Sequence, residues 1–269
     1  MMSKARGKRA TASIFLQKGK MKKNISMFFP AYNEEKNIPE IIEKATKVLR
    51  EAAGKYEIII VVYEGSTDNT INIVKNYAKK DRHVRLILQP KDKKGVGYAK
   101  VLGFKNAKYP YVFYADADLQ FDLNDFKKFL PYIGEFDVIA GYRIKRQDPL
   151  SRILVSKFYN ILMRLLFNVK ERDLDCAFRL VSKNVIKNIN LMCRTGVATT
   201  ELLAKARKNG FRIKEIGVGH YPRKYGEPIF ESKFLNIPKP KVVMEILREM
   251  KMLYKDLNLK DYKKSGKKS

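Results

Sequence analysis

Short apolar runs alternate with helical patterns through the first half of the chain. Residues 25–29, 56–63, 84–88, 111–115 and 136–140 have the composition of strands, while 37–53, 68–80, 97–107 and 123–132 carry apolar residues at helical spacing. The strand runs lack polar alternation, which is typical of parallel strands buried on both faces. The pattern predicts an α/β fold with a Rossmann-like, doubly wound, mostly parallel sheet and helices on both faces.

Polar or glycine-rich turns follow four successive predicted strands. They occupy residues 30–35, 64–70, 93–97 and 116–120. The carboxyl ends of parallel strands meet at one edge of a sheet, and ligands bind there. Helix capping explains any one of these turns, as Thr67 and Asp68 before a helix illustrate. All four on one edge predict a pocket for a nucleotide with a metal-bound diphosphate.

The fourth turn offers a set of metal ligands. Asp116, Asp118 and Gln120 are spaced i, i+2 and i+4, so a strand that loosens at its end would project all three to one side. Mg²⁺ and Mn²⁺ prefer such oxygen ligands and complete their shells with water and phosphate. The alternative is a solvated turn with Asp as a helix cap. We predict a Mg²⁺ or Mn²⁺ cofactor here.

These segments resemble a known family. The sequence Pro-Ala-Tyr-Asn-Glu-Glu at 30–35, the turn at 65–70, Gly95, Gly97, Ala99 and the 116–120 set are similar to those of family 2 glycosyltransferases with the GT-A fold. Segments 141–143, 173–179 and 220–226 fit the dolichyl- or polyprenyl-phosphate mannose synthase group within it. The resemblance covers roughly residues 24–230 and implies transfer of a hexose from a nucleotide sugar, with inversion.

The resemblance implies a role for each matching residue. The nucleotide sugar would be bound by Pro30, Tyr32, Glu34, Glu64 and Asp116, and the cation by Asp116, Asp118 and Gln120. The expected catalytic set is Asp118, Arg143, Arg152, Ser156 and Arg223. Within it, Arg223 would meet the donor phosphate, and Arg143, Arg152 and Ser156 would receive an acceptor phosphate.

The chain departs from the family pattern at two places. Tyr63 and Glu64 stand where the family has two Asp residues, which leaves the donor open between GDP-mannose and UDP-glucose types, with family likeness favouring GDP-mannose. Thr200-Glu201-Leu202 lacks the Asp of the Thr-Glu-Asp base that serves hydroxyl acceptors. A phosphate monoester is already anionic at neutral pH and needs no base. We therefore expect dolichyl or polyprenyl phosphate as acceptor; Glu201 is either catalytic or a carboxylate paired with a Lys.

Two amphipathic stripes offer a route to a membrane. Residues 149–167 place apolar side chains on one face, with Arg152, Lys157 and Arg164 between them, and a second stripe covers 242–257. Basic amphipathic helices can lie in the headgroup plane, although packing on the sheet or pairing in a dimer explains such stripes equally. No apolar run reaches the ~18–20 residues of a membrane span. We therefore predict interfacial helices and a peripheral membrane protein. Only two cysteines are present, which favours a reducing compartment and hence the cytoplasmic face of the membrane.

The charge of the chain bears on its partners and its ends. Lys and Arg number 56 against 28 Asp and Glu, a formal net charge of +28. We predict a disordered basic extension over 1–23, a GT-A domain over 24–230, and an amphipathic helix with a Lys-rich tail over 231–269. The expected partners are a nucleotide sugar, polyprenyl phosphate and a membrane surface, with no nucleic acid. Two alternatives stay open: a family 2 enzyme with a glycan hydroxyl as acceptor, and a basic lipid- or nucleic-acid-binding protein on a degenerate scaffold.

Overall fold

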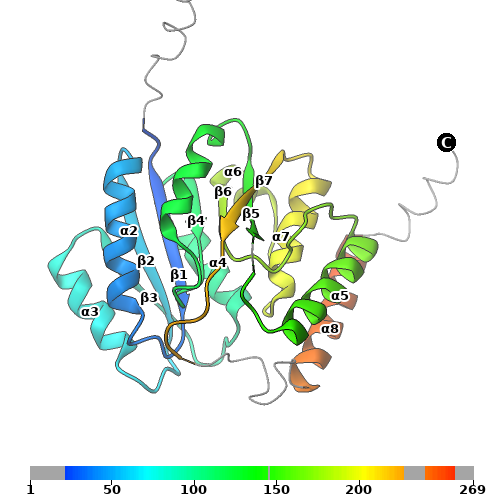
Figure 1. Ribbon diagram of the computed structural model, residues 1–269, viewed down its shortest axis with the longest axis horizontal. Coiled ribbons are helices and arrows are strands. Elements are labelled where there is room, and N and C mark those ends of the chain that lie inside the picture. The colour runs from blue at the N-terminus through cyan, green and yellow to red at the C-terminus, as the bar shows by residue number, and fades with distance from the viewer. Residues whose placement is uncertain (1–21, 145, 227–239, 258–269) are drawn as a thin grey trace, which may run out of the picture.

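A seven-stranded sheet forms the centre of the molecule. The structure is a computed structural model that describes residues 22–144, 146–226 and 240–257. The strands run in the order β3-β2-β1-β4-β6-β5-β7 (Figure 1). Their bounds are β1 Ile25–Ala31, β2 Tyr56–Tyr63, β3 Val84–Gln89, β4 Tyr111–Tyr114, β5 Val138–Ile144, β6 Arg179–Ser182 and β7 Ile213–Gly219. Most of the predicted basic extension and the Lys-rich end after 257 fall outside the described residues.

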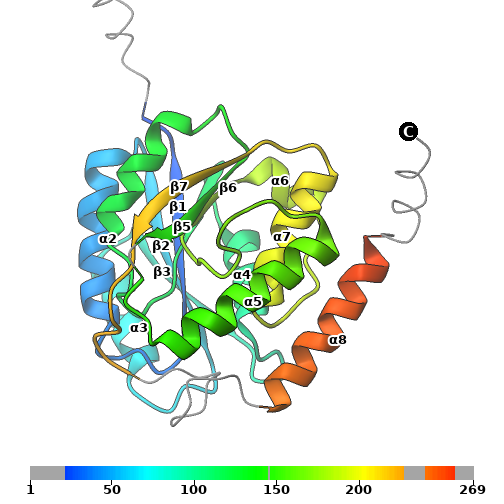
Figure 2. The same ribbon diagram turned by 45° about the vertical axis from the view of Figure 1, so that its right-hand side comes forward.

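Helices cover both faces of this sheet. One face packs against α2 (Ile38–Ala52), α3 (Thr70–Lys80) and the helix η1 (Leu123–Tyr132). The other face packs against α4 (Val96–Asn106), α5 (Leu150–Phe167), α6 (Lys183–Asn188) and α7 (Val197–Lys208). A final helix, α8 (Pro240–Asp256), lies beyond α7 at the side of the molecule (Figure 2).

The apolar runs bury strands β1 and β2 along most of their length. Along β1, Ile25, Met27 and Phe29 enter the core under α2, whereas Phe28 enters the core under α4. Fully burying one such side chain contributes about 1.5–3 kcal/mol. The prediction of a mostly parallel sheet with helices on both faces is confirmed, and the arrangement is that of an α/β sheet.

The structure also departs from the predicted elements. Strand β6 is antiparallel to both neighbours, with Tyr111 opposite Ser182 and Val138 opposite Val181. The predicted helix over 123–132 is a 3₁₀ helix that contains Pro131. Proline has no N–H to donate to an α-helical ladder, which is consistent with the absence of a regular α-helix here. The strand predicted at 136–140 begins two residues later, at Val138.

The carboxyl ends of the parallel strands gather at the lower end of the sheet in Figure 1. Helix α5 crosses this end in front of the sheet (Figure 2). Among the described residues, no helix combines the length and the apolar character needed to cross a membrane.

Candidate active site

A cavity of about 410 Å³ lies at this edge of the sheet, between the strand ends, α5 and α8. It is lined by every predicted site residue except one: Pro30, Tyr32, Glu34, Asp116, Asp118, Gln120, Arg143, Arg152, Ser156 and Arg223. Glu64 does not line it, whereas its neighbour Tyr63 does. Segments almost 200 positions apart in the sequence therefore meet in one space.

Two tyrosines and a lysine form one end of the cavity. The ring centroids of Tyr32 and Tyr63 lie 5.7 Å apart, and Lys94 Nζ lies 5.8 and 6.0 Å from them. The Tyr63 hydroxyl donates to the carbonyl of Lys91 at 2.9 Å, which fixes the ring. This end offers flat aromatic faces and a positive charge, which suit a base and a phosphate.

The turn after β2 braces the turn after β1. Thr67 N–H donates to Asn33 Oδ1 at 2.8 Å, Glu34 N–H donates to Thr70 Oγ1 at 2.9 Å, and Asp68 Oδ2 accepts from Glu35 N–H at 3.0 Å. Asn33 takes a left-handed φ of 54° within this brace. The polar residues at 67–70 thus hold the loop that presents Glu34.

The predicted metal ligands lie together after β4. Asp118 and Gln120 are buried and Asp116 is partly exposed. Asp118 Oδ1 accepts from Gln120 N–H at 3.1 Å, and Leu119 between them has a φ of 61°. A left-handed leucine is strained and often marks a functional turn. Within the described ranges no three His, Cys, Asp or Glu side chains form a metal cluster. Two carboxylates with one amide nevertheless fit a hard cation that draws its other ligands from water and phosphate.

Arg223 joins two carboxylates across the cavity. Its Nη2 lies 2.9 Å from Asp118 Oδ2, and its Nη1 lies 3.2 Å from Glu34 Oε1. Burial, together with the charge of Asp116, raises the pKa of Asp118 to about 6 despite the opposing charge of Arg223. Burial also raises the pKa of Glu34 to about 7. The loop after β7 is thereby tied to the metal-ligand turn by an ion pair.

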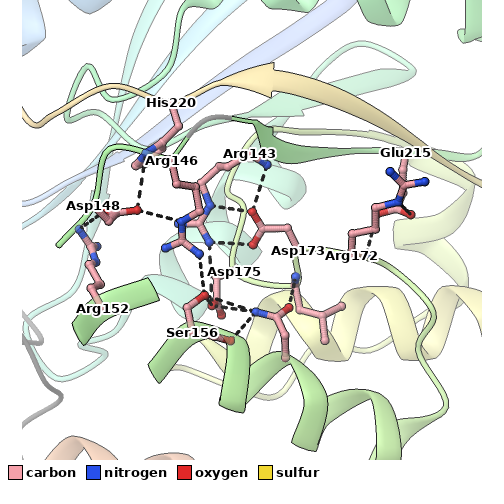
Figure 3. Close-up of polar contacts among 12 residues, drawn as sticks. Arg143, Arg146, Asp148, Arg152, Ser156, Arg172, Asp173, Asp175, Glu215 and His220 are labelled. Carbon is pink, nitrogen blue, oxygen red and sulfur yellow. Dashed lines mark hydrogen bonds and ion pairs between the residues drawn. The ribbon is translucent and has the colours of Figure 1, made fainter. Parts of the chain in front are cut away.

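The far end of the cavity holds a network of arginines and aspartates (Figure 3). Arg143 makes a bidentate pair with Asp173, with Nε–Oδ2 and Nη2–Oδ1 both at 2.7 Å. Ser156 Oγ accepts from Arg146 Nη1 at 2.9 Å and donates to Asp175 Oδ2 at 2.7 Å. Arg143 and Ser156, predicted to receive a phosphate, are therefore held in place by carboxylates.

Asp148 is the meeting point of a second part of this network. Its side chain is 2 % exposed; Arg146 Nε and Arg152 Nη1 each lie 2.9 Å from its oxygens, and His220 Nδ1 lies 3.7 Å away (Figure 3). Burial lowers the pKa of His220 to about 4, so the imidazole is neutral at pH 7. Arg146 and Arg152 are thus already oriented by Asp148. A phosphate that entered this end could accept bidentate hydrogen bonds from them if it displaced their contacts with Asp148.

Sequence reasoning missed several members of the site. Arg146, Asp148 and Asp175 line or brace the far end, yet they lie in loops without periodicity. The Asp-x-Asp spacing at 173 and 175 was the available signal for Asp175. Nothing in the sequence pointed to Lys100, because a lysine on a helix is usually solvated.

Lys100 lies on α4, in the wall of the cavity. Its side chain is buried, and Nζ donates to Thr199 Oγ1 at 2.7 Å and lies 5.2 Å from the centroid of the Tyr114 ring. Burial lowers its pKa to about 8, so the ammonium form still predominates at neutral pH.

Glu201 lies outside the cavity lining and has a structural environment. Its oxygens accept from the N–H groups of Met192 and Cys193 and from Lys205 Nζ at 2.7 Å. It is fully buried on α7. Of the two alternatives for Glu201, a carboxylate paired with a lysine is the one observed.

The comparisons with known proteins agree with this geometry. The family model described as Glycosyl transferase family 2 matches residues 26–189. The chain belongs to this family.

Curated relatives of this family-2 chain include two bacterial proteins named undecaprenyl-phosphate 4-deoxy-4-formamido-L-arabinose transferase. The protein from Pectobacterium carotovorum is 30 % identical over 208 residues, which cover 76 % of this chain and 62 % of that protein. The protein from Proteus mirabilis is 29 % identical over 216 residues, which cover 79 % of this chain and 65 % of that protein. The chain thus spans somewhat under two thirds of the length of these relatives.

Solved structures show the same fold. Glucosyl-3-phosphoglycerate synthase from Mycobacterium tuberculosis, in complex with Mn²⁺, uridine diphosphate and glucosyl-3-phosphoglycerate, aligns with a TM-score of 0.61 and 17 % identity. The alignment covers 84 % of this chain and 79 % of that one. The GT-A fold expected from the sequence is confirmed.

Proposed function

We propose that this protein transfers a glycosyl group from a nucleotide sugar to a polyprenyl phosphate at a membrane surface, with the help of a divalent cation. The observation that carries the proposal is the layout of the cavity. The turn with Asp116 and Asp118 lies in the same space as the arginine network around Ser156. The names of the curated relatives, which act on undecaprenyl phosphate, support the same acceptor class.

The chemistry follows from these two ends. An oxygen of the acceptor phosphate attacks C1 of the sugar, the bond between C1 and the donor diphosphate breaks, and the configuration at C1 inverts. The nucleoside diphosphate leaves with the electron pair of that bond. Arg143 and Ser156 orient the nucleophile, and orientation alone supplies much of the acceleration in such reactions. A divalent cation held by Asp116, Asp118 and Gln120 would stabilise the charge on the leaving diphosphate.

Arg223 has a role on the donor side. It pairs with Asp118 and Glu34 and stands where a donor diphosphate would approach the metal-ligand turn. A donor with its cation would compete for Asp118 and release Arg223 toward the diphosphate oxygens. The loop at 220–226 would then close over the donor.

Helix α5 supports the membrane part of the proposal. Its outer face exposes large apolar side chains: Leu150 at 71 %, Leu154 at 56 %, Phe158 at 70 %, Ile161 at 53 % and Leu165 at 71 %. Its inner face presents Arg152 and Ser156 to the cavity. A helix with these two faces can lie in a headgroup layer while it receives a lipid phosphate.

A hydroxyl acceptor is the second candidate, and Asp175 favours it. This carboxylate lines the cavity, and burial raises its pKa, with Arg143 opposing. A hydroxyl nucleophile needs a general base of this kind. In the structure Asp175 is engaged by Ser156 and Asn160, which favours a positioning role over proton transfer.

The test is a donor panel. Purified protein with Mg²⁺ or Mn²⁺ is mixed with GDP-mannose, UDP-glucose and other nucleotide sugars and with a short polyprenyl phosphate. We expect a glycosylated product that partitions into organic solvent, lost on chelation and in Asp118→Asn. A water-soluble product made from a glycan acceptor would favour the second candidate. No product from any donor, with nucleotide binding indifferent to Asp118→Asn, would overturn the proposal. Mannose and dolichol stay predictions until that panel is run.

A further inference from the structure

The buried ammonium of Lys100 has no ion-pair partner in the part of the chain that the structure describes. It donates to Thr199 Oγ1 and faces the ring of Tyr114. An ammonium has three protons to donate. Burying a charge is costly unless it is paired, and such costs are commonly accepted at binding sites. Two N–H groups of Lys100 therefore remain to donate to acceptor oxygens of a ligand.

The position of Lys100 indicates which part of a ligand it meets. It lines the cavity together with Ala99 and Gly95 from the start of α4. Its Nζ lies 5.2 Å from the centroid of the Tyr114 ring, two residues before Asp116 on the donor side, and Asp175 on the acceptor side lines the same cavity. In the proposed reaction the transferred sugar lies between the leaving diphosphate and the acceptor phosphate. Lys100 is thus placed beside the sugar.

Resting on the function proposed above, we propose that Lys100 selects a donor whose transferred sugar carries a carboxylate, the class of hexuronic acids. A carboxylate neutralises the ammonium and accepts two of its hydrogen bonds in a charge-assisted contact. A neutral sugar hydroxyl would accept a hydrogen bond but would leave Lys100 without a direct ion-pair partner. A site with a buried polar group discriminates strongly against a ligand that leaves that group unpaired.

Matched donor pairs test this directly. UDP-glucose and UDP-glucuronic acid share the base and the ring and differ only in oxidation at C6; GDP-mannose and GDP-mannuronic acid form a second pair. Binding of each donor with Mn²⁺ is measured by calorimetry without any acceptor, and turnover is measured separately with polyprenyl phosphate. For whichever base binds, we expect the uronate to bind about 10- to 100-fold more tightly than its neutral partner.

The variant Lys100→Met keeps the length of the side chain and removes the charge. We expect it to erase the preference for the uronate and to leave binding of the neutral donor unchanged or stronger. Lys94→Met is the matched control, because Lys94 lies by the aromatic end and faces the part shared by both donors. It should weaken both members of a pair equally. Lys100→Gln, which retains a donor toward Thr199, serves if the Met variant does not fold.

Three outcomes would overturn this role. Equal affinity of the wild type for both members of the binding pair is the first. An equal loss for both donors in Lys100→Met would assign Lys100 to the diphosphate. If Lys100→Met raised only the KM for polyprenyl phosphate, Lys100 would be assigned to acceptor binding. Failure of turnover with an intact uronate preference in binding would count against the proposed acceptor, not against Lys100.

Discussion

At the scale of single residues, the Arg143–Asp173 pair shows how the arginine-rich end of the cavity is built. Both partners are nearly inaccessible, with side chains 7 % and 10 % exposed. Removing one partner of a buried pair leaves the other charge uncompensated. Asp173 therefore compensates the buried charge of Arg143 and fixes its guanidinium in the cavity wall.

We predict that Asp173→Asn lowers the free energy of unfolding by about 3 kcal/mol, because buried Arg143 would lose its bidentate partner and keep only Asp175, 4.0 Å away, as a counter-charge. Urea unfolding measures this. The control is Arg172→Ala: that side chain is 70 % exposed and lies 4.0 Å from Glu215 (Figure 3), so a change of about 0–1 kcal/mol is expected. Equal effects of the two substitutions would contradict the buried-pair account.

The same pair predicts an acid dependence of stability. Burial tends to raise the pKa of Asp173, but the hydrogen bonds and charge of Arg143 outweigh it and hold this pKa below 3.8, its ordinary value. A depressed carboxyl pKa contributes stability above the unfolded value and loses it as the pH falls through the folded pKa. The gap between wild type and Asp173→Asn should be widest near neutral pH and shrink below about pH 4. A gap independent of pH would argue against this ion pair.

At the scale of elements, the close approach of α4 to the segment before α7 sets the cavity wall. A Cβ on Gly97 would lie 2.1 Å from the Cys193 carbonyl oxygen, and Gly97 N–H donates to the Arg194 carbonyl at 2.8 Å. Lys100 and Thr199 face each other across this junction. Glycine at 97 is therefore a packing requirement.

We predict that Gly97→Ala destabilises the protein by at least about 2 kcal/mol, since the carbonyl it would strike belongs to the backbone and cannot rotate away. Gly196→Ala is the control, because nothing lies within 4 Å of a Cβ there. That substitution should be neutral or raise stability by about 0.4–1 kcal/mol. The melting temperatures of the two variants measure this difference. A Gly97→Ala variant as stable as the wild type would show that α4 can move away from α7.

Helix α5 gives a second prediction at this scale. Replacing both Phe158 and Leu165 by Ser should weaken binding to anionic vesicles at least tenfold, given about 1.5–3 kcal/mol for each buried side chain. Folding stability should hardly change, because both side chains are about 70 % exposed. Leu88→Ser, on the edge strand β3, is the control for vesicle sedimentation. Unchanged sedimentation of the double variant would remove α5 as the membrane contact.

At the scale of the whole molecule, the cavity is a junction of segments that share no local sequence. Arg223 pairs with Asp118 at a separation of 105 residues and with Glu34 at 189. Helix α8 packs against α7, buries Met250 and Leu253 in the same core cluster, and contributes Ile246 to the cavity lining. A ligand in the cavity would thus contact segments from the first strand to the last described helix.

Ligand binding should therefore stabilise the fold as a unit. We predict that a nucleoside diphosphate with Mn²⁺, at about 100 times its Kd, raises the free energy of unfolding by about 2.7 kcal/mol. The effect should vanish with a chelator and in Asp118→Asn. Comparing UDP with GDP in thermal unfolding also identifies the base. A shift that survives chelation would remove the cation from donor binding.

The sequence predicted the strands around the cavity and many of the residues that line it, because the signals are local. Buried parallel strands are continuous apolar runs, and polar turns at their ends must share one edge. The turn at 116–120 was predicted in this way, whereas the arginine and serine positions came from the family resemblance, and their roles stay predictions. The domain boundaries at 23 and 230 stay predictions.

Tertiary structure alone decided the features that depend on partners distant in sequence. Three features are of this kind: the antiparallel pairing of β6, the ion pairs of Arg143, Arg146 and Arg152 with aspartates, and the hydrogen bonds of buried Glu201 to backbone N–H groups. None of these residues carries a periodic signal. Lys100 is the sharpest case. Its sequence neighbourhood is that of an ordinary helix, and only the packing of α4 against α7 and the sheet removes its charge from water and places it in the cavity wall. Sequence periodicity fixes which residues share a face; desolvation and pairing are properties of the assembled fold.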